Sequence, residues 1–62
     1  MMSIILLKLR KGRLFRLAER DTAAVWVKGD VDKRDRKFKC YKHEDKTYKR
    51  KFLGNTKVWI GK

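Results

Sequence analysis

Apolar and polar residues alternate along much of this chain, and a period near two is the pattern of half-buried β-strands. Runs rich in β-branched and aromatic residues cover 23–31, 36–43, 48–53 and 56–60. Turn-forming residues separate them at Lys11-Gly12 and at 32–35, 44–47 and 54–55. We therefore predict a single small all-β domain over residues 1–62. Its five strands are expected near residues 4–9, 13–18, 23–31, 36–43 and 48–60, the last bent back as a hairpin.

Short strands at this spacing are typical of a small five-stranded barrel of the SH3-like or OB-like kind. A helix over residues 13–24 is the competing interpretation, because Leu14, Leu17 and Ala18 also fit one helical face. The apolar opening, Met1 to Leu9, lacks the order of charge and cleavage site of a secretory signal and is too short to span a membrane. We expect it to form a first strand or a packing arm.

The central hairpin has a predicted register. If residues 32–35 form the loop, Val31 faces Arg36, and strand alternation places Phe38 and Cys40 on the core face, together with Val25 and Val27. The opposite, outward face then carries Trp26, Lys28, Lys37, Lys39 and Tyr41. Lys28 would face Lys39, a like-charged pair that destabilises a sheet unless an anion binds there. Gly29 within the strand pattern predicts a bulge.

The last hairpin has two possible registers, and a slip of one residue exchanges its faces. A two-residue turn at Gly54-Asn55 places Leu53 with Val58 and Ile60. A loop of three residues, ending at Thr56, places Phe52 with Val58 and Ile60 instead. We prefer the second register because it gives one apolar face. It leaves outward Lys49, Lys51, Lys57 and Trp59.

Charge adds a functional expectation to this fold. The 62 residues include 19 Lys or Arg and 7 Asp or Glu, for a formal net charge of +12. A basic run with interleaved aromatic residues extends from Lys33 to Lys51, a combination that attracts phosphate polyanions and can stack bases. We predict a non-enzymatic module that binds DNA or RNA with weak sequence preference. The predicted site comprises Trp26 and Tyr41 as stacking residues and Lys28, Lys37, Lys39, Lys49, Arg50 and Lys51 as phosphate ligands.

Other chemistry finds little support in the sequence. Cys40 and His43 have the spacing of half a zinc site, but no second pair of ligands exists, so we expect a buried thiol and neither metal nor cofactor. Asp30, Asp32 and Asp35 are read as turn residues paired with neighbouring Lys and Arg. No nucleophile stands beside a base, and we predict no enzymatic activity. A free cysteine suits a reducing compartment, which favours the cytoplasm.

Two other function classes remain open. The protein could bind an acidic protein or form a homodimer through its sheet edges, although edge lysines oppose such pairing. It could instead be a peripheral membrane protein that uses Ile4 to Leu7 together with its basic surface.

Three short motifs carry a resemblance over roughly residues 7–60. They are Lys11-Gly12-x-x-Phe15-x-Leu17, the stretch from Val25 to Asp32, and Arg36-Lys37-Phe38-x-Cys40-Tyr41. In these the chain resembles small uncharacterised basic β proteins of Bacteroides-type bacteria, several of them borne on mobile elements. The resemblance implies a bacterial cytoplasmic β domain and carries over no catalytic or binding residue. A likeness to SH3-like barrels is an analogy of fold alone and does not give function.

Overall fold

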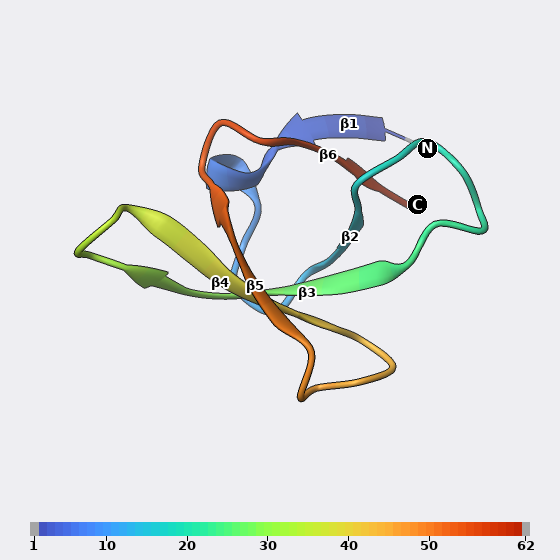
Figure 1. Ribbon diagram of the computed structural model, residues 1–62. Helices are drawn as coiled ribbons and strands as arrows, with labels where there is room; N and C mark the ends of the chain where they lie inside the picture. Colours follow the sequence, from blue (N-terminus) through green and yellow to red (C-terminus); the bar gives the residue numbers. More distant parts are fainter. Residues whose placement is uncertain (1, 62) are drawn as a thin grey trace.

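A single antiparallel sheet of six strands makes up the fold in the computed structural model, which describes residues 2–61 (Figure 1). The strands are β1 (Met2–Ile5), β2 (Leu14–Arg16), β3 (Val25–Asp32), β4 (Lys37–Lys42), β5 (Lys49–Leu53) and β6 (Lys57–Ile60). Their order in the sheet is β1-β6-β2-β3-β4-β5. The all-β prediction is confirmed. Six strands form where five were predicted, because the two arms of the hairpin expected over 48–60 are the separate strands β5 and β6. The strand expected over 4–9 instead begins at Met2 and gives way to a turn of 3-10 helix after Ile5.

That short helix, η1 (Leu6–Lys8), follows β1 and is hydrogen-bonded to the turn between β5 and β6. The Leu6 N–H donates to the Thr56 carbonyl at 2.9 Å, and the Leu7 N–H donates to the Gly54 carbonyl at 2.8 Å. Both acceptors lie in the turn between β5 and β6. The sheet therefore bends back on itself (Figure 1), although no ladder among the described residues joins β5 to β1.

The predicted pairing of the last two strands is wrong. A loop of three residues does separate β5 from β6, and the Thr56 N–H donates to the Leu53 carbonyl at 3.0 Å. The strands then diverge, since β5 pairs with β4 while β6 pairs with β1 and β2. Because β1 and β2 occupy the two edges of β6, no edge of β6 is left for β5, which remains an edge strand of the sheet.

The core lies inside the bend of the sheet. Leu6, Phe15, Cys40 and Val58 are completely buried, and Phe52 and Ile60 pack against them. Phe52, Val58 and Ile60 therefore contribute to the same core, although the hairpin register that was predicted to bring them together does not form. The helical alternative for residues 13–24 is not: this stretch contains β2 and then turns and bends. No helix within residues 2–61 is long and apolar enough to cross a membrane.

A β-bulge at Gly29 decides which side chains face the core. Beyond it, towards the turn, Val31 pairs with Phe38; before it, Lys28 pairs with Cys40. Two residues of β3 thus lie opposite Lys39 alone, as the sequence predicted for Gly29. A Cβ atom at Gly29 would overlap the Lys39 carbonyl oxygen, so the close approach of the two strands requires glycine.

The bulge also corrects the predicted register. The turn occupies residues 33–36, with Asp32 opposite Lys37 rather than Val31 opposite Arg36. The Arg36 N–H donates to the Asp32 carbonyl at 2.8 Å, and Arg36 takes a left-handed φ of 57°. The extra residue at the bulge then exchanges the two faces for everything that precedes it in β3. Trp26 and Lys28 consequently face the core, and Val27 lies on the opposite face of the sheet beside Tyr41, where it is nevertheless buried.

Candidate nucleic-acid interface

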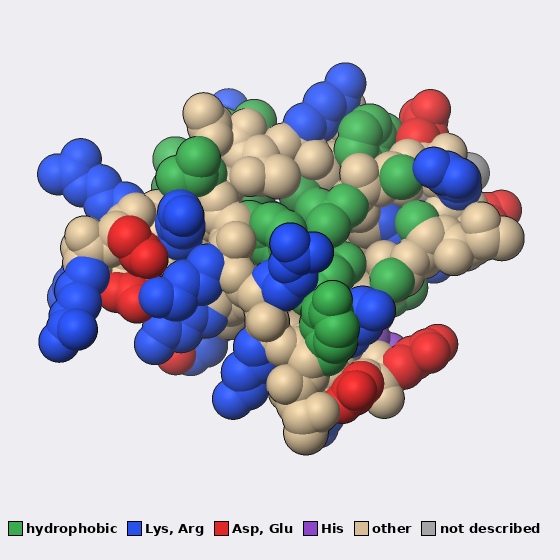
Figure 2. Space-filling view, viewed as in Figure 1, with side chains coloured by type: hydrophobic (Ala, Val, Ile, Leu, Met, Phe, Trp, Pro, Cys, Tyr) green, Lys and Arg blue, Asp and Glu red, His purple; other side chains and the backbone are tan. Residues whose placement is uncertain are grey.

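The outward face of the β4–β5 hairpin gathers most of the predicted phosphate ligands. The register pairs Lys37 with Leu53, Lys39 with Lys51, and Tyr41 with Lys49. Because alternate residues of a strand share a face, all six lie on the same side of the sheet. Basic side chains also crowd the end of the molecule around the β3–β4 turn, with acidic groups among them (Figure 2). The sequence prediction for Lys37, Lys39, Tyr41, Lys49 and Lys51 is confirmed as far as their placement on one face.

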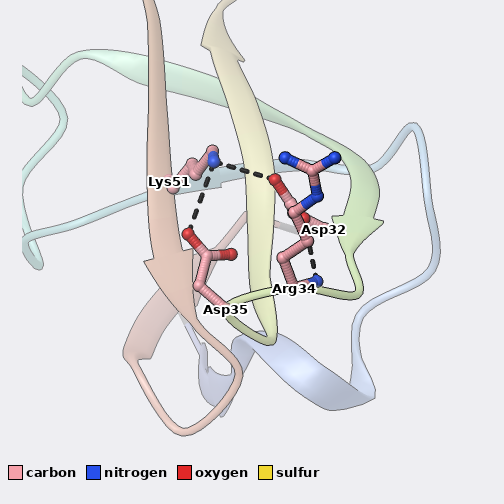
Figure 3. Close-up of polar contacts among 4 residues, drawn as sticks. All are labelled: Asp32, Arg34, Asp35 and Lys51. Atoms are coloured by element: carbon pink, nitrogen blue, oxygen red, sulfur yellow. Dashed lines mark hydrogen bonds and ion pairs between the residues drawn. The ribbon is translucent and has the colours of Figure 1, made fainter.

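Lys51 differs from its neighbours because two carboxylates bind it. Its Nζ lies 2.8 Å from Asp32 Oδ2 and 3.4 Å from Asp35 Oδ2 (Figure 3). Asp32 also accepts the Arg34 N–H at 3.0 Å. The hydrogen bond from Lys51 lowers the pKa of Asp32, and the same bond raises the pKa of Lys51. The aspartates do form ion pairs, but the expected pairing with neighbouring Lys and Arg is wrong, because the partners are Lys51 and, for Asp30, Lys11, both distant in sequence.

An open depression of about 380 Å³ lies beside these lysines. Tyr41 lines it from β4, Gly29 and Asp30 line it from the bulge, and Lys46 reaches it from the β4–β5 loop. The remaining lining residues are Lys11, Lys39, Cys40 and Lys49. The ion pairs of the described residues involve Lys11 and Lys51 and leave Lys39, Lys46 and Lys49 without a carboxylate partner. Three lysines that form no ion pair among the described residues therefore line the same depression as Tyr41.

Two predicted site residues do not belong to this surface. Trp26 is buried, with its ring 5.3 Å from that of Phe52 in an edge-to-face contact, so it cannot stack on a base. Lys28 is 5% exposed and points to the opposite face, where its Nζ donates to the carbonyl oxygens of Leu6 at 2.8 Å and of Leu9. Their assignment to the outward face is wrong, because strict alternation was carried through the bulge.

Arg50 occupies an intermediate position. Its register partner is Cys40, which places it on the other face of the strand from Lys49 and Lys51. Since β5 is an edge strand, however, its exposed side chain still borders a second hollow of about 350 Å³ that Lys39, Lys49 and Lys51 also line. Arg50 can therefore contribute charge at the rim of the basic face but not at the depression around Tyr41.

The depression includes two charged residues that sequence reasoning did not assign to the site. Lys11 and Asp30 form an ion pair, with Lys11 Nζ 2.7 Å from Asp30 Oδ1. The Gly12 N–H donates to the Lys28 carbonyl at 2.8 Å, which fixes the turn before β2 next to the bulge. This bond and the pairing of β2 with β3 bring Lys11 to Asp30, and no local pattern signals these long-range contacts. Lys46 was recognisable as part of the basic run but had no predicted place on a face.

Other aromatic residues already have cations over their rings. Lys42 Nζ lies 4.2 Å from the centroid of Tyr48, and Lys57 Nζ lies 5.3 Å from that of Trp59. Neither ring lines the depression. Cys40 is buried, as predicted, and desolvation raises the pKa of its thiol. Within residues 2–61 no group of three His, Cys, Asp or Glu side chains gathers in a metal-binding arrangement.

Comparisons with protein-family models, with curated proteins and with solved structures found no match to this chain.

Proposed function

We propose that the protein binds single-stranded nucleic acid, without catalysis, through the outward face of β4 and β5. The observation that carries this proposal is the position of Tyr41 among Lys39, Lys46 and Lys49, none of which has a carboxylate partner among the described residues. Lysines so close together repel one another and cost stability in the free protein. A polyanion bound across them removes that repulsion and releases its own counterions.

Tyr41 is the reason to favour single strands over duplexes. A base can stack on an aromatic ring only when it is unpaired and turned out of its own stack. Trp26 is buried, and Tyr48 and Trp59 lie away from the depression, so Tyr41 is the aromatic ring that the basic face offers. Lysines on both sides of this ring would contact the phosphates that flank the stacked nucleotide.

The strand order supports a comparison with small β-barrels at the level of fold. The five strands β6-β2-β3-β4-β5 follow one another in a strongly bent sheet, to which β1 adds a sixth. We propose that these five form an SH3-like unit. Bent five-stranded sheets of the OB kind bind oligonucleotides on an exposed sheet face, which agrees with the position of the basic face here.

The experiment compares fluorescence anisotropy titrations of labelled single-stranded DNA, single-stranded RNA, duplex DNA and heparin at two salt concentrations. We expect single strands to bind best, with a logarithmic salt slope of about −2 to −3 if three or four phosphates are neutralised. Tyr41→Leu should weaken single-strand binding roughly tenfold, since stacking on one base contributes about 1–3 kcal/mol. The matched control is Tyr48→Leu, which removes a 45% exposed tyrosine outside the depression.

Three results would count against the proposal. Equal binding of heparin and oligonucleotides, unaffected by Tyr41→Leu, would reduce the interaction to bulk electrostatics. Equal loss in the two tyrosine variants would separate binding from the depression. An absence of binding at low salt would refute nucleic-acid binding and favour a protein partner. A sedimentation experiment on the free protein would then test self-association, for which the uncharged edge strand β1 (Met2–Ile5) offers unpaired backbone groups.

A further inference from the structure

Asp30 is a negatively charged residue in a depression lined by lysines, and attraction of phosphate alone does not account for it. It is the one carboxylate among the described residues that line the depression, and its side chain is 72% exposed. A carboxylate at this position repels the phosphates that the lysines attract. The bulge at Gly29 is what directs Asp30 towards the depression, and it does so opposite Lys39. An acceptor group held beside a stacking residue suggests contact with a base edge rather than with the backbone.

The ion pair with Lys11 gives this acceptor a defined pattern. Lys11 Nζ lies 2.7 Å from Asp30 Oδ1, and no hydrogen-bond donor among the described residues contacts Oδ2. The pair therefore presents, side by side, one ammonium donor and two carboxylate acceptors. We call these three groups, Lys11 Nζ and the two carboxylate oxygens of Asp30, the Lys11–Asp30 row. Tyr41 lines the same depression, so a base stacked on its ring would have one edge within reach of this row.

The geometry points to guanine as the base taken by this depression, an inference that rests on the proposed function. The Watson–Crick edge of guanine presents an acceptor, O6, followed by two donors, N1–H and N2–H. Lys11 would donate to O6, and the two oxygens of Asp30 would accept from N1–H and N2–H. Paired hydrogen bonds to an ionised carboxylate are stronger than neutral ones and are specific in geometry. Stacking on Tyr41 would cover the ion pair from water and strengthen all three contacts.

The other bases fit this row less well. Cytosine has the opposite group at each position, a donor followed by two acceptors, so its donor would face Lys11 and its acceptors would face the carboxylate. Adenine places a donor against Lys11 and an acceptor against Asp30. Uracil and thymine match at two positions but place an acceptor where guanine has its N2 amino group. Hypoxanthine, which is guanine without that amino group, loses one contact and keeps the other two. The expected order is guanine first, hypoxanthine next, and cytosine and adenine last.

The test uses short labelled deoxycytidine oligomers that differ only in one central base: guanine, hypoxanthine, adenine, thymine or cytosine. Cytosine is the background because it fits the ion pair least well, whereas flanking thymines would match two of the three contacts and compete for the depression. Anisotropy titrations of the full chain should show roughly tenfold tighter binding of the guanine oligomer than of the cytosine oligomer, the size of a paired base contact. Asp30→Asn should abolish this preference. It should leave salt-dependent binding intact or tighter, because a negative charge is removed from the depression. Asp30 is exposed, so this variant should fold, which circular dichroism would verify.

The matched control is Asp35→Asn, which removes the same charge outside the depression and must leave the base preference unchanged. Equal affinity for all oligomers in the wild-type protein would overturn the guanine inference and leave the proposed function standing. A guanine preference that survives Asp30→Asn would also overturn it. If no oligomer binds, the proposed function fails and this inference fails with it.

Discussion

Replacement of Lys28 by methionine tests how the core holds a charged side chain. Lys28 Nζ donates to the carbonyl oxygens of Leu6 at 2.8 Å, of Leu7 at 3.4 Å and of Leu9, and it lies 4.1 Å from the centroid of the Phe38 ring. These carbonyls belong to the end of η1, where a helix leaves its acceptors without partners. Methionine has a similar length but donates no hydrogen bond.

The loss of stability in Lys28→Met depends on which hydrogen bonds each carbonyl oxygen retains. The Leu6 oxygen still accepts the Leu9 N–H at 3.0 Å, whereas the buried Leu9 oxygen loses the bond from Lys28. Hydrogen bonds to a charged group contribute about 1.5–3 kcal/mol each, and two of the three are buried. Burial of the Lys28 ammonium group costs desolvation free energy, which also lowers the pKa of Lys28. Replacing this cation by methionine removes that cost and offsets part of the loss. We expect a net loss of about 2–4 kcal/mol.

That loss is large for a chain of 62 residues. At about 0.05–0.15 kcal/mol per residue, its whole free energy of unfolding is only a few kcal/mol. Denaturant unfolding followed by tryptophan fluorescence should show a much lower midpoint for Lys28→Met, and the thermal midpoint should fall by about 10 °C or more. Lys33→Met, the same change in the exposed β3–β4 turn, should shift stability by less than about 0.5 kcal/mol. Equal or greater stability of Lys28→Met would refute the reasoning, because the buried charge would then be a net cost.

Three further predictions concern the bulge, the acidic turn and the thiol. Gly29→Ala should destabilise the fold by about 1–3 kcal/mol, because its Cβ would overlap the Lys39 carbonyl oxygen; Gly61→Ala, which meets no neighbour, is the control in the same denaturant titration. Since Lys51 lowers the pKa of Asp32 in the folded state, the unfolded chain binds more protons near pH 4. The thermal midpoint should therefore be constant above about pH 5 and fall below about pH 4, less steeply in Asp32→Asn; an unchanged acid response would contradict this. Cys40, buried and raised in pKa, should react with a thiol reagent only as the protein unfolds, and rapid labelling of the native protein would show the core to be open.

The sequence predicted the strands from Val25 to Leu53 and their basic outward face because these depend on local patterns. Alternation alone places Lys37, Lys39 and Tyr41 together, and the same holds for Lys49 and Lys51. Alternation assigned Trp26 and Lys28 to the wrong face, although the bulge at Gly29 was predicted. A bulge adds one residue to one strand, so every face assignment on its far side changes.

Other features depend on contacts that no local pattern encodes. The separation of β5 from β6 follows from competition between ladders, since β1 and β2 both pair with β6. The ion pair between Lys11 and Asp30 exists because the turn at Gly12 is hydrogen-bonded to Lys28. Composition indicated an affinity for polyanions, but only the three-dimensional arrangement selects Tyr41 as the aromatic residue that the basic face presents.

The central claim is that the β4–β5 face, and not net charge, binds nucleic acid. The most direct test is the affinity of a labelled single-stranded oligonucleotide for Lys39→Glu/Lys49→Glu, measured beside Lys8→Glu/Arg20→Glu. Both double variants change the net charge equally, but Lys8 and Arg20 are exposed in η1 and in the β2–β3 connection, away from the depression. We predict near-complete loss of binding in the first variant and only a small loss in the second. Equal weakening in both would contradict the account.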